Sequence, residues 1–280
     1  MKHIYIIVFS LLLCACSKNM EPGQGAESTL IYQVTTDVQM EIKSSQPATA
    51  VNMLWYGVYH KKDDGTYRYM SDMSAFVKIE DPSQITVPIT LIKDQQYKIV
   101  FVAQYKYKKD ADEEEYTYRI DSGDNNQFAR MYLKNPDALL EDGDKMDVFT
   151  FCDEVLSGPG MQTKGITLTR PVAKVDIGTS ATELPENLEL AVQGIPAYYD
   201  LFTQTYSTDF VELKYAGEPQ DGGVIANGTL YKKLASFYAF YGSSVSCTLK
   251  LQYAGGAEKE VNVNDITLAP NFKTNIVGNI

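Results

Sequence analysis

Apolar and polar residues alternate with a period of two along much of this chain. Between Leu30 and Ile42 the odd positions from Gln33 to Glu41 are polar. The even positions of the same stretch are Leu30, Tyr32, Val34, Thr36, Val38, Met40 and Ile42. Because successive side chains of a β-strand point to opposite faces of a sheet, the pattern predicts a strand with one buried face. The stretch covers about 13 residues against a usual strand of about 5–6, so it is either one long strand or two in succession.

The stretch Tyr97–Tyr107 alternates in the same way, but it also carries Val100 and Val102 on its otherwise polar face. Apolar residues on both faces are typical of a central strand in a two-layer sandwich. Glycine-containing turn signals separate other runs of strand-like sequence: Asp63-Asp64-Gly65, Asn227-Gly228 and Gly255-Gly256. Such residues supply the positive φ angles that tight hairpins need.

The sequence shows no sustained helical period, and we expect only one short helix, at Pro136–Glu141, because proline suits a first helical position. The alternating strand and helix units of a parallel α/β enzyme are missing. The strand pattern breaks within Leu156–Lys164, where Ser157-Gly158-Pro159-Gly160 stands. The sequence therefore predicts an all-β fold with β-sandwich domains at residues 29–158 and 159–280, since each part has roughly the length of a sandwich.

The first residues have the composition of an export signal. Lys2 and His3 precede the apolar run Ile4–Leu13, which is too short to span a membrane. The run leads into Leu13-Cys14-Ala15-Cys16, which resembles the lipobox of bacterial lipoproteins. Cys16 is the expected lipidation site, because Leu13 is too large to precede a cleavage before Cys14.

We therefore predict a signal peptide at residues 1–15 and a lipidated, flexible tether at residues 16–28, rich in Gly, Pro, Ser and Glu. One acyl chain binds a membrane only marginally, whereas two or three chains anchor a protein stably. An uncleaved anchor and ordinary secretion are the alternatives. Localisation at the outer membrane, exposed on the cell surface, follows from the lipidated form.

Charge and cysteine content limit the partners. Loss of Lys2 with the signal peptide changes the formal net charge from −11 to −12, which disfavours nucleic acid and anionic lipid as main partners. Cys152 and Cys247 either form a disulfide after export or remain buried thiols, and the sequence favours the second. With His60 as the only histidine after residue 3, a structural zinc site is disfavoured.

Motifs that carry catalysis are missing from the sequence. It contains no G-x-S-x-G, P-loop, dinucleotide-binding glycine pattern or H-E-x-x-H. His60 lies beside a predicted turn, where we expect it to be solvated. The acidic run Asp110–Glu115 predicts a solvated loop, with a cation site as the alternative. Asp142, Asp144 and Asp147 lack the glycine and glutamate of an EF-hand loop. We therefore predict no enzymatic activity, no cofactor and no metal site.

The chain is rich in tyrosine, with 20 residues. Exposed tyrosines could stack on sugars, but tyrosine is also a good strand former, and we favour a structural role for most of them. Trp55 lies in an apolar run and is expected in the core.

Four segments together resemble fimbrillin-like lipoproteins of Bacteroides-type bacteria, in an uncharacterised branch of that family. Thr167–Val175 is similar to their LxRPxAKV segment, and Asn271–Asn279 is similar to their closing NYRTNIxGN strand. Leu54–Tyr59 and Asp147–Phe149 also fit the family pattern. From the residues themselves, the alternation after Pro171 predicts the opening strand of the second domain, and Asn271–Asn279 predicts a closing strand beside it.

The resemblance implies two tandem transthyretin-like, Greek-key β-sandwich domains. In pilus subunits of the family it also implies donor strand exchange, in which a protease removes the first strand after an arginine and a neighbour's strand fills the groove. Leu30–Ile42 would be the exchangeable strand here. No arginine occurs before Arg68, and Ile280 directly follows the expected last strand. Both features favour an anchor, accessory or stand-alone protein over a repeating shaft subunit.

These observations predict a non-enzymatic, lipid-anchored surface protein for adhesion or pilus assembly. Its expected partners are the outer membrane, through the lipid, and fimbrial subunits or a host or glycan ligand. A surface glycan-binding lipoprotein is the alternative, and a hydrolase with paired carboxylates is the third hypothesis.

Overall fold

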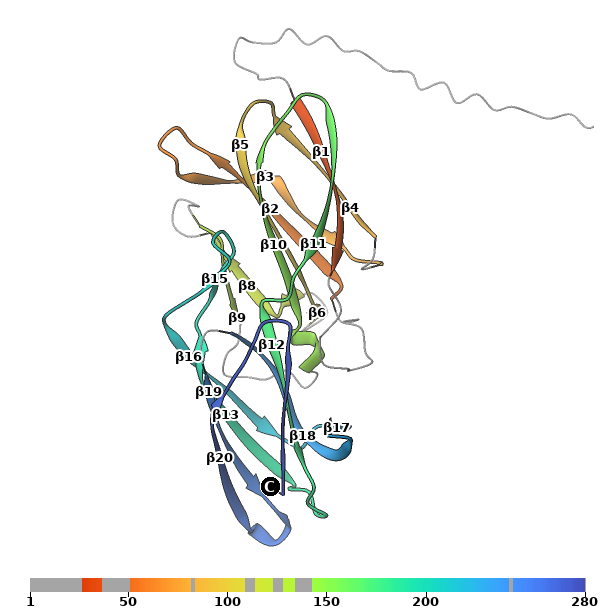
Figure 1. Cartoon of the computed structure of the whole chain (residues 1–280), viewed down its shortest axis with the longest axis vertical. Helices are drawn as coiled ribbons and strands as arrows, with labels where there is room; N and C mark the ends of the chain where they lie inside the picture. The colour runs from red at the N-terminus through yellow and green to blue at the C-terminus, as the bar shows by residue number, and fades with distance from the viewer. Residues whose placement is uncertain are drawn as a thin grey trace, which may run out of the picture.

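The structure is a computed structural model that describes residues 27–36, 51–81, 84–108, 114–122, 128–133, 143–241 and 244–279. Within these ranges the chain forms β-strands and short 3-10 turns, which confirms the all-β prediction. None of the helical turns in these ranges is long and apolar enough to cross a membrane. Figure 1 shows an elongated molecule, with the first strands at one end and the C-terminal strands at the other. The predicted helix at Pro136–Glu141 lies outside the described residues.

The N-terminal sandwich consists of a three-stranded and a four-stranded sheet. The smaller sheet has the order β11-β1-β4, with β11 at Met161–Leu168, β1 at Glu27–Thr36 and β4 at Ile85–Ile92. The larger sheet has the order β10-β5-β2-β3, with β10 at Val148–Leu156, β5 at Gln96–Gln104, β2 at Met53–Lys61 and β3 at Tyr67–Lys78. Glu27 and Ser28, which the sequence assigned to the tether, already belong to β1.

The C-terminal sandwich consists of two four-stranded sheets. One has the order β17-β18-β12-β21, with β17 at Gly223–Ala226, β18 at Thr229–Phe240, β12 at Val172–Thr179 and β21 at Lys273–Gly278. The other has the order β16-β13-β19-β20, with β16 at Phe210–Gly217, β13 at Asn187–Pro196, β19 at Val245–Gln252 and β20 at Glu258–Ile266. The parallel pairing of β12 with β21 confirms that the closing strand lies beside the opening strand.

Both sandwiches repeat one topology. The first strand of each sandwich pairs in parallel with the last strand and antiparallel with a middle strand: β1 with β11 and β4, and β12 with β21 and β18. In the opposing sheets, the order β10-β5-β2-β3 corresponds to β20-β19-β13-β16. The chain is therefore a tandem repeat in structure, although no internal repeat is evident in the sequence.

This pairing moves the domain boundary. The predicted division after residue 158 assigned Met161–Leu168 to the C-terminal domain, but these residues form β11 and hydrogen-bond to β1. Ser157-Gly158-Pro159-Gly160 makes the turn between β10 and β11, both of which belong to the N-terminal sandwich. We propose instead that the division falls between Leu168 and Val172. A turn and a domain linker have the same composition, so the sequence could not distinguish them.

A small third sheet joins the two sandwiches. It has the order β15-β14-β9-β8, with β15 at Thr205–Tyr206, β14 at Tyr199–Asp200, β9 at Arg130–Leu133 and β8 at Tyr118–Asp121. Strand β14 comes from the C-terminal half and β9 from the N-terminal half. Beside this sheet, β6 (Lys106–Lys108) pairs with β7 (Glu114–Tyr116).

The apolar residues form two cores. One fills the N-terminal sandwich, and the other fills the C-terminal sandwich and continues onto the outer face of β2 and β5. Strand β5 contributes to both, since Ile99 and Phe101 lie in the first core and Val100 and Val102 in the second. This arrangement confirms the prediction of a central strand. Trp55 is 7% exposed, as expected for a core residue.

The predicted hairpins are confirmed at all three turn signals. Between β17 and β18, Asn227 and Gly228 have φ angles of 49° and 78°. Positive φ at both central residues is the geometry of a type I′ turn, and its twist matches that of the flanking strands.

Candidate functional site

Strand β1 occupies the centre of the smaller N-terminal sheet. Its residues Glu27 to Val34 pair antiparallel with β4, and residues Thr29 to Thr36 pair in parallel with β11. Both edges of β1 are therefore hydrogen-bonded, and its removal would open a groove with two unpaired edges. This groove is the candidate site for strand exchange.

The inward side chains of β1 fill the space between the two sheets. Leu30, Tyr32 and Val34 are 7%, 0% and 1% exposed, respectively, while Gln33 between them faces solvent. The Tyr32 ring meets Phe101 of the opposing sheet edge-on, with 4.8 Å between ring centroids. Burial of one such side chain stabilises a fold by about 1.5–3 kcal/mol, so the three together hold the strand firmly.

A buried polar contact adds specificity to this packing. The Tyr32 hydroxyl donates a hydrogen bond to Oδ2 of Asp153 on β10, at 2.7 Å. Lys164 Nζ, on β11, lies 2.7 and 2.8 Å from the two Asp153 carboxylate oxygens. Burial raises the pKa of Tyr32 far above its ordinary value, and the hydrogen bond to Asp153 raises it further. The hydroxyl therefore keeps its proton and links β1 to β10 in the opposing sheet, and Asp153 extends the link to Lys164 on the neighbouring strand β11.

The structure places half of the predicted exchangeable residues in one row. Leu30, Tyr32 and Val34 share the inward face of β1. Val38, Met40 and Ile42, like the predicted lipidation site Cys16, lie outside the described residues. Neither Asp153 nor Lys164 could be predicted at this groove from the sequence, because their proximity depends on the pairing of β1 with β11.

Three of the four family-like segments meet at the junction between the sandwiches. Arg170 from the LxRPxAKV-like segment pairs with Asp147, with 2.6 Å between Nε and Oδ1 and 2.9 Å between Nη2 and Oδ2. Its Nη1 also donates a hydrogen bond to Oδ1 of Asn271, in the closing segment. The guanidinium lies over the ring of Phe149, 4.6 Å from its centroid. The family-like residues thus form a cluster of contacts at the junction between the sandwiches. Asp147 belongs to this cluster as the ion-pair partner of Arg170.

The opening strand of the C-terminal sandwich is tied to its neighbours by a second buried pair. Asp176 on β12 accepts a hydrogen bond from Ser236 on β18 at 2.6 Å, and Lys273 Nζ on β21 lies 2.5 Å from its Oδ2. Burial alone would raise the pKa of Asp176, but the bonds from Lys273 and Ser236 outweigh it, so the pKa is lowered.

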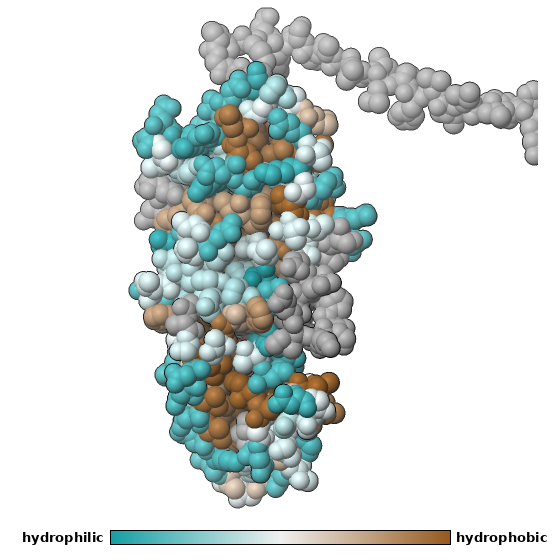
Figure 2. All heavy atoms as spheres, in the orientation of Figure 1, coloured by the Kyte–Doolittle hydropathy of each residue, from teal (hydrophilic) through white to brown (hydrophobic). Residues whose placement is uncertain are grey.

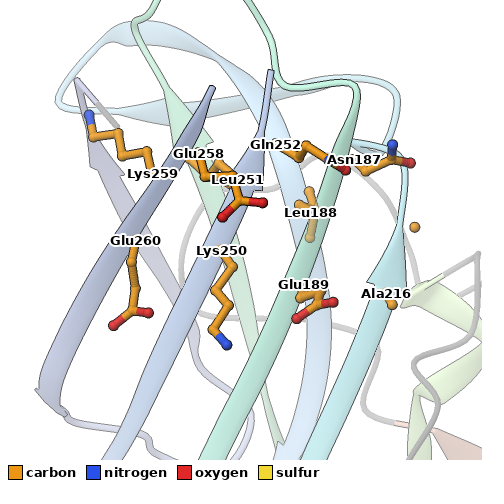
Figure 3. A pocket seen from close by; sticks show the side chains of 11 residues that line it. Asn187, Leu188, Glu189, Ala216, Lys250, Leu251, Gln252, Glu258, Lys259 and Glu260 are labelled. Carbon is orange, nitrogen blue, oxygen red and sulfur yellow. The ribbon is translucent and has the colours of Figure 1, made fainter. Parts of the chain in front are cut away.

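A hollow of the described surface lies on the outer face of the sheet formed by β16, β13, β19 and β20. It has a volume of about 720 Å³, and Figure 3 shows Glu189, Lys250 and Glu260 projecting from three neighbouring strands. Lys250 is in register with both glutamates, so unlike charges stand opposite one another across the strands. No aromatic ring lines the hollow. A polar outer face is normal for an antiparallel sheet, so we assign no ligand to it.

Cys152, Cys247 and His60, which were considered as possible reactive groups, lie within strands. Cys152 and Cys247 are free thiols on β10 and β19. His60 is half-buried in β2, with its Nε2 3.0 Å from Oε1 of Gln95, which corrects the expectation of a solvated side chain. The described ranges contain no group of three or more His, Cys, Asp and Glu side chains that could hold a metal ion. Residues 110–113 of the acidic run lie outside these ranges.

Solved structures of bacterial proteins have a similar fold. A candidate polysaccharide-binding protein from Bacteroides thetaiotaomicron shares 15% sequence identity, with a TM-score of 0.55 over 85% of this chain and 80% of that chain. A candidate adhesin from Bacteroides ovatus shares 14% identity, with a TM-score of 0.53 over 90% of this chain and 89% of that chain. The fimbrial anchor protein Mfa2 from Porphyromonas gingivalis shares 14% identity, with a TM-score of 0.47 over 84% and 82% of the two chains.

At these identities the likeness concerns the fold, and it confirms at that level the resemblance drawn from the sequence motifs. Comparison with curated protein sequences finds no match. A family model, described as a family of unknown function (DUF6562), matches residues 22–280. The chain therefore belongs to this family of unknown function, DUF6562.

Proposed function

We propose that this chain is a non-enzymatic, fimbrillin-like surface protein that acts as an accessory or anchor in fimbrial assembly or in adhesion. The observation that carries the proposal is the position of β1, a first strand held between β4 and β11 in the centre of a sheet. A strand in that position is the one that strand donation replaces. The shared fold of a candidate adhesin from Bacteroides ovatus supports the same class of function.

The contacts of β1 favour an accessory protein over a shaft subunit. The groove is filled by the chain's own strand, and Tyr32 completes a buried contact with Asp153 inside it. The arginine nearest to β1 within the described residues that follow it is Arg68, in β3, where cleavage would cut a paired strand. A protein that keeps its own first strand cannot accept a donor at this groove, and it therefore ends or anchors a chain of subunits.

Lipidation of Cys16 at the outer membrane is part of the proposal. Strand β1 begins at Glu27, and about eleven residues of extended chain reach at most about 40 Å. The N-terminal sandwich would then stand next to the membrane and the C-terminal sandwich would point away from it (Figure 1). Cys16→Ala is expected to abolish incorporation of a labelled fatty acid and to release the protein from the membrane fraction. Continued labelling of this variant would contradict the anchor.

An exposed apolar hairpin in the C-terminal sandwich supports a partner protein. Ile225 on β17 and Leu230 on β18 are directly paired across the hairpin and are 65% and 71% exposed. Figure 2 shows apolar surface where this hairpin lies. Paired exposed apolar side chains of this size are typical of interaction surfaces. The hairpin lies far from the end of the molecule where β1 begins, which suits contact with another subunit.

Crosslinking on cells tests the assembly role. A photoreactive amino acid at Ile225 or Leu230 is expected to capture a fimbrial subunit, whereas the same group at the exposed Phe210 on β16 should capture none. If neither hairpin position yields a crosslinked partner, the assembly role fails.

A second candidate function, glycan binding, is favoured by a different observation. An aromatic pocket lies on the outer face of β2 and β3, away from both the β1 groove and the apolar hairpin. The candidate polysaccharide-binding protein of Bacteroides thetaiotaomicron has a similar fold, which supports glycan binding as an alternative for this chain.

A further inference from the structure

Six aromatic side chains gather where β7 and β8 cross the outer face of β2 and β3. They are Trp55, Tyr59, Tyr69, Phe76, Tyr116 and Tyr118, and they line a pocket of about 310 Å³. Gln104 and Arg119 contribute polar groups to the same lining. The volume is at the lower end of the range of small-molecule sites, and it suits a ligand of one ring.

The strand register builds this pocket. Trp55 is paired with Phe76, and Tyr59 is paired with Tyr69, so four rings lie on one face of the β2–β3 hairpin. Gly57 stands between the two pairs on the same face of β2. A Cβ at Gly57 would lie 2.3 Å from Cη2 of Trp55, so the indole extends over this glycine. The glycine of the segment Leu54–Tyr59 is thus required for the position of the indole.

The rim of the pocket is an exposed ring stack. Phe76 is 52% exposed and lies against Tyr116, with 5.1 Å between ring centroids and 17° between ring planes. An exposed phenylalanine stacked on a half-buried tyrosine beside a hollow forms a contiguous apolar patch, whereas single exposed apolar side chains are normal on protein surfaces. The rim therefore offers a flat apolar platform to a ligand.

One of the rings that line the pocket carries a polar group without a partner. Tyr59 is fully buried, and its hydroxyl has no hydrogen-bond partner among the described residues. A buried hydroxyl left unpaired destabilises a fold by about 1–3 kcal/mol, so such groups are few and need an explanation. Burial raises the pKa of Tyr59, so this hydroxyl stays protonated and is able to donate or accept a hydrogen bond.

We propose that this pocket binds one pyranose ring of a glycan. A pyranose presents C–H groups on its faces and hydroxyls at its edge, which match the aromatic faces at the rim and the unpaired hydroxyl of Tyr59 among the lining rings. An ammonium ligand would also suit a cage of rings, so a cation is the comparison ligand for the sugar. The inference rests on and deepens the glycan-binding candidate, and it does not depend on the assembly role.

The chain provides its own reporter for this binding, because Trp55 is its only tryptophan. We expect the methyl glycosides of glucose, galactose, mannose and N-acetylglucosamine, titrated into the whole mature protein, to include at least one that shifts Trp55 emission with saturation. Tetramethylammonium is the comparison ligand and should leave the emission unchanged. Saturable binding of tetramethylammonium with no response to any of the sugars would overturn the proposal.

Two variants separate a binding role from a structural one. Phe76→Ala removes the exposed platform and is expected to weaken sugar binding at least about tenfold, whereas Phe210→Ala, a 55% exposed phenylalanine on β16, should have no effect. Tyr59→Phe keeps the ring and removes only the hydroxyl. This variant is expected to bind the sugar about fivefold more weakly, even though the loss of a buried unpaired hydroxyl should stabilise the fold.

A Tyr59→Phe protein that is more stable and binds sugar unchanged would show that the hydroxyl has no ligand role. Loss of binding in Phe210→Ala to the same extent as in Phe76→Ala would place the sugar elsewhere. Either result overturns the assignment of the pocket, whereas the crosslinking experiment on cells tests the assembly role separately.

Discussion

Arg170 and Asp147 form a bidentate ion pair in which both side chains are 2% exposed. Asp147 directly precedes β10 in the N-terminal sandwich, and Arg170 lies between β11 and β12. The pair therefore holds the chain in place between the two sandwiches. Asn271, at the start of the closing segment, accepts a hydrogen bond from the same guanidinium.

Arg170→Met is expected to destabilise the protein by about 3–5 kcal/mol, because it leaves the carboxylate of Asp147 buried without its cation. Urea unfolding of the purified protein measures the change. Lys78→Met is the control, since Lys78 pairs with Glu80 at the surface and both side chains are more than 70% exposed. A similar small effect of the two substitutions would contradict the role of the Arg170 pair.

Tyr32→Phe is expected to loosen β1 without changing its apolar packing. The variant loses one hydrogen bond to a charged acceptor, worth about 1.5–3 kcal/mol, and leaves Asp153 with Lys164 alone. Faster amide hydrogen exchange across residues 27–36 would report the loosening. Tyr67→Phe is the matched control, because Tyr67 donates an exposed hydrogen bond to Glu154 outside the β1 groove. Equal exchange rates in both variants would show that the buried contact does not hold the strand.

Asp176→Asn is expected to reduce the sensitivity of the protein to acid. The pKa of Asp176 is lowered in the folded state, so its charge stabilises the fold at pH values above the ordinary carboxyl pKa. That stabilisation is lost as the pH falls from about 4 through the lowered pKa. Urea unfolding measures the free energy of unfolding of both proteins. The gap in this free energy between wild type and variant should be wide at pH 7 and narrow at pH 3. A constant gap would argue against this linkage.

Cys152 and Cys247 are expected to resist alkylation in the folded protein. Burial raises the pKa of Cys152 to about 12 and the pKa of Cys247 to about 11, so neither is a thiolate near neutral pH. Mass spectrometry after iodoacetamide treatment at pH 8 should find both unmodified until urea unfolds the chain. A cysteine placed at the exposed Lys78 provides the positive control. Rapid labelling of Cys152 in the native protein would show that β10 opens.

Gly57→Ala is expected to displace the Trp55 indole, since the added methyl would lie 2.3 Å from the ring. Forcing extra volume into a packed site destabilises a protein by about 1–3 kcal/mol. A red shift of Trp55 emission together with a lower urea midpoint would report the displacement. Gly65→Ala tests a glycine with no neighbour near its Cβ, where the cost comes only from its φ of 82°. An unchanged emission spectrum in Gly57→Ala would contradict the packing of the indole.

Local signals in the sequence determined the strands and their turns. The alternation at Leu30–Val34 and Tyr97–Ala103 predicted which side chains face inward, because the two-residue period of a strand is a property of the backbone. Asn227-Gly228 predicted its hairpin for an equally local reason, the positive φ angles. The pairing of β12 with β21 was also expected, from the family resemblance and the opening pattern after Pro171.

The tertiary structure decided the contacts between residues that are distant in sequence. No local pattern places Asp153 and Lys164 under Tyr32, or Arg170 beside Asp147, because these distances follow from which strands are neighbours. The neighbours of each strand also decide that β11 belongs to the first sandwich and that the Tyr59 hydroxyl is unpaired. Alternation fixes which face of a strand is buried, but only the order of strands in the sheets fixes what that face meets, and this order is a long-range property of the whole chain.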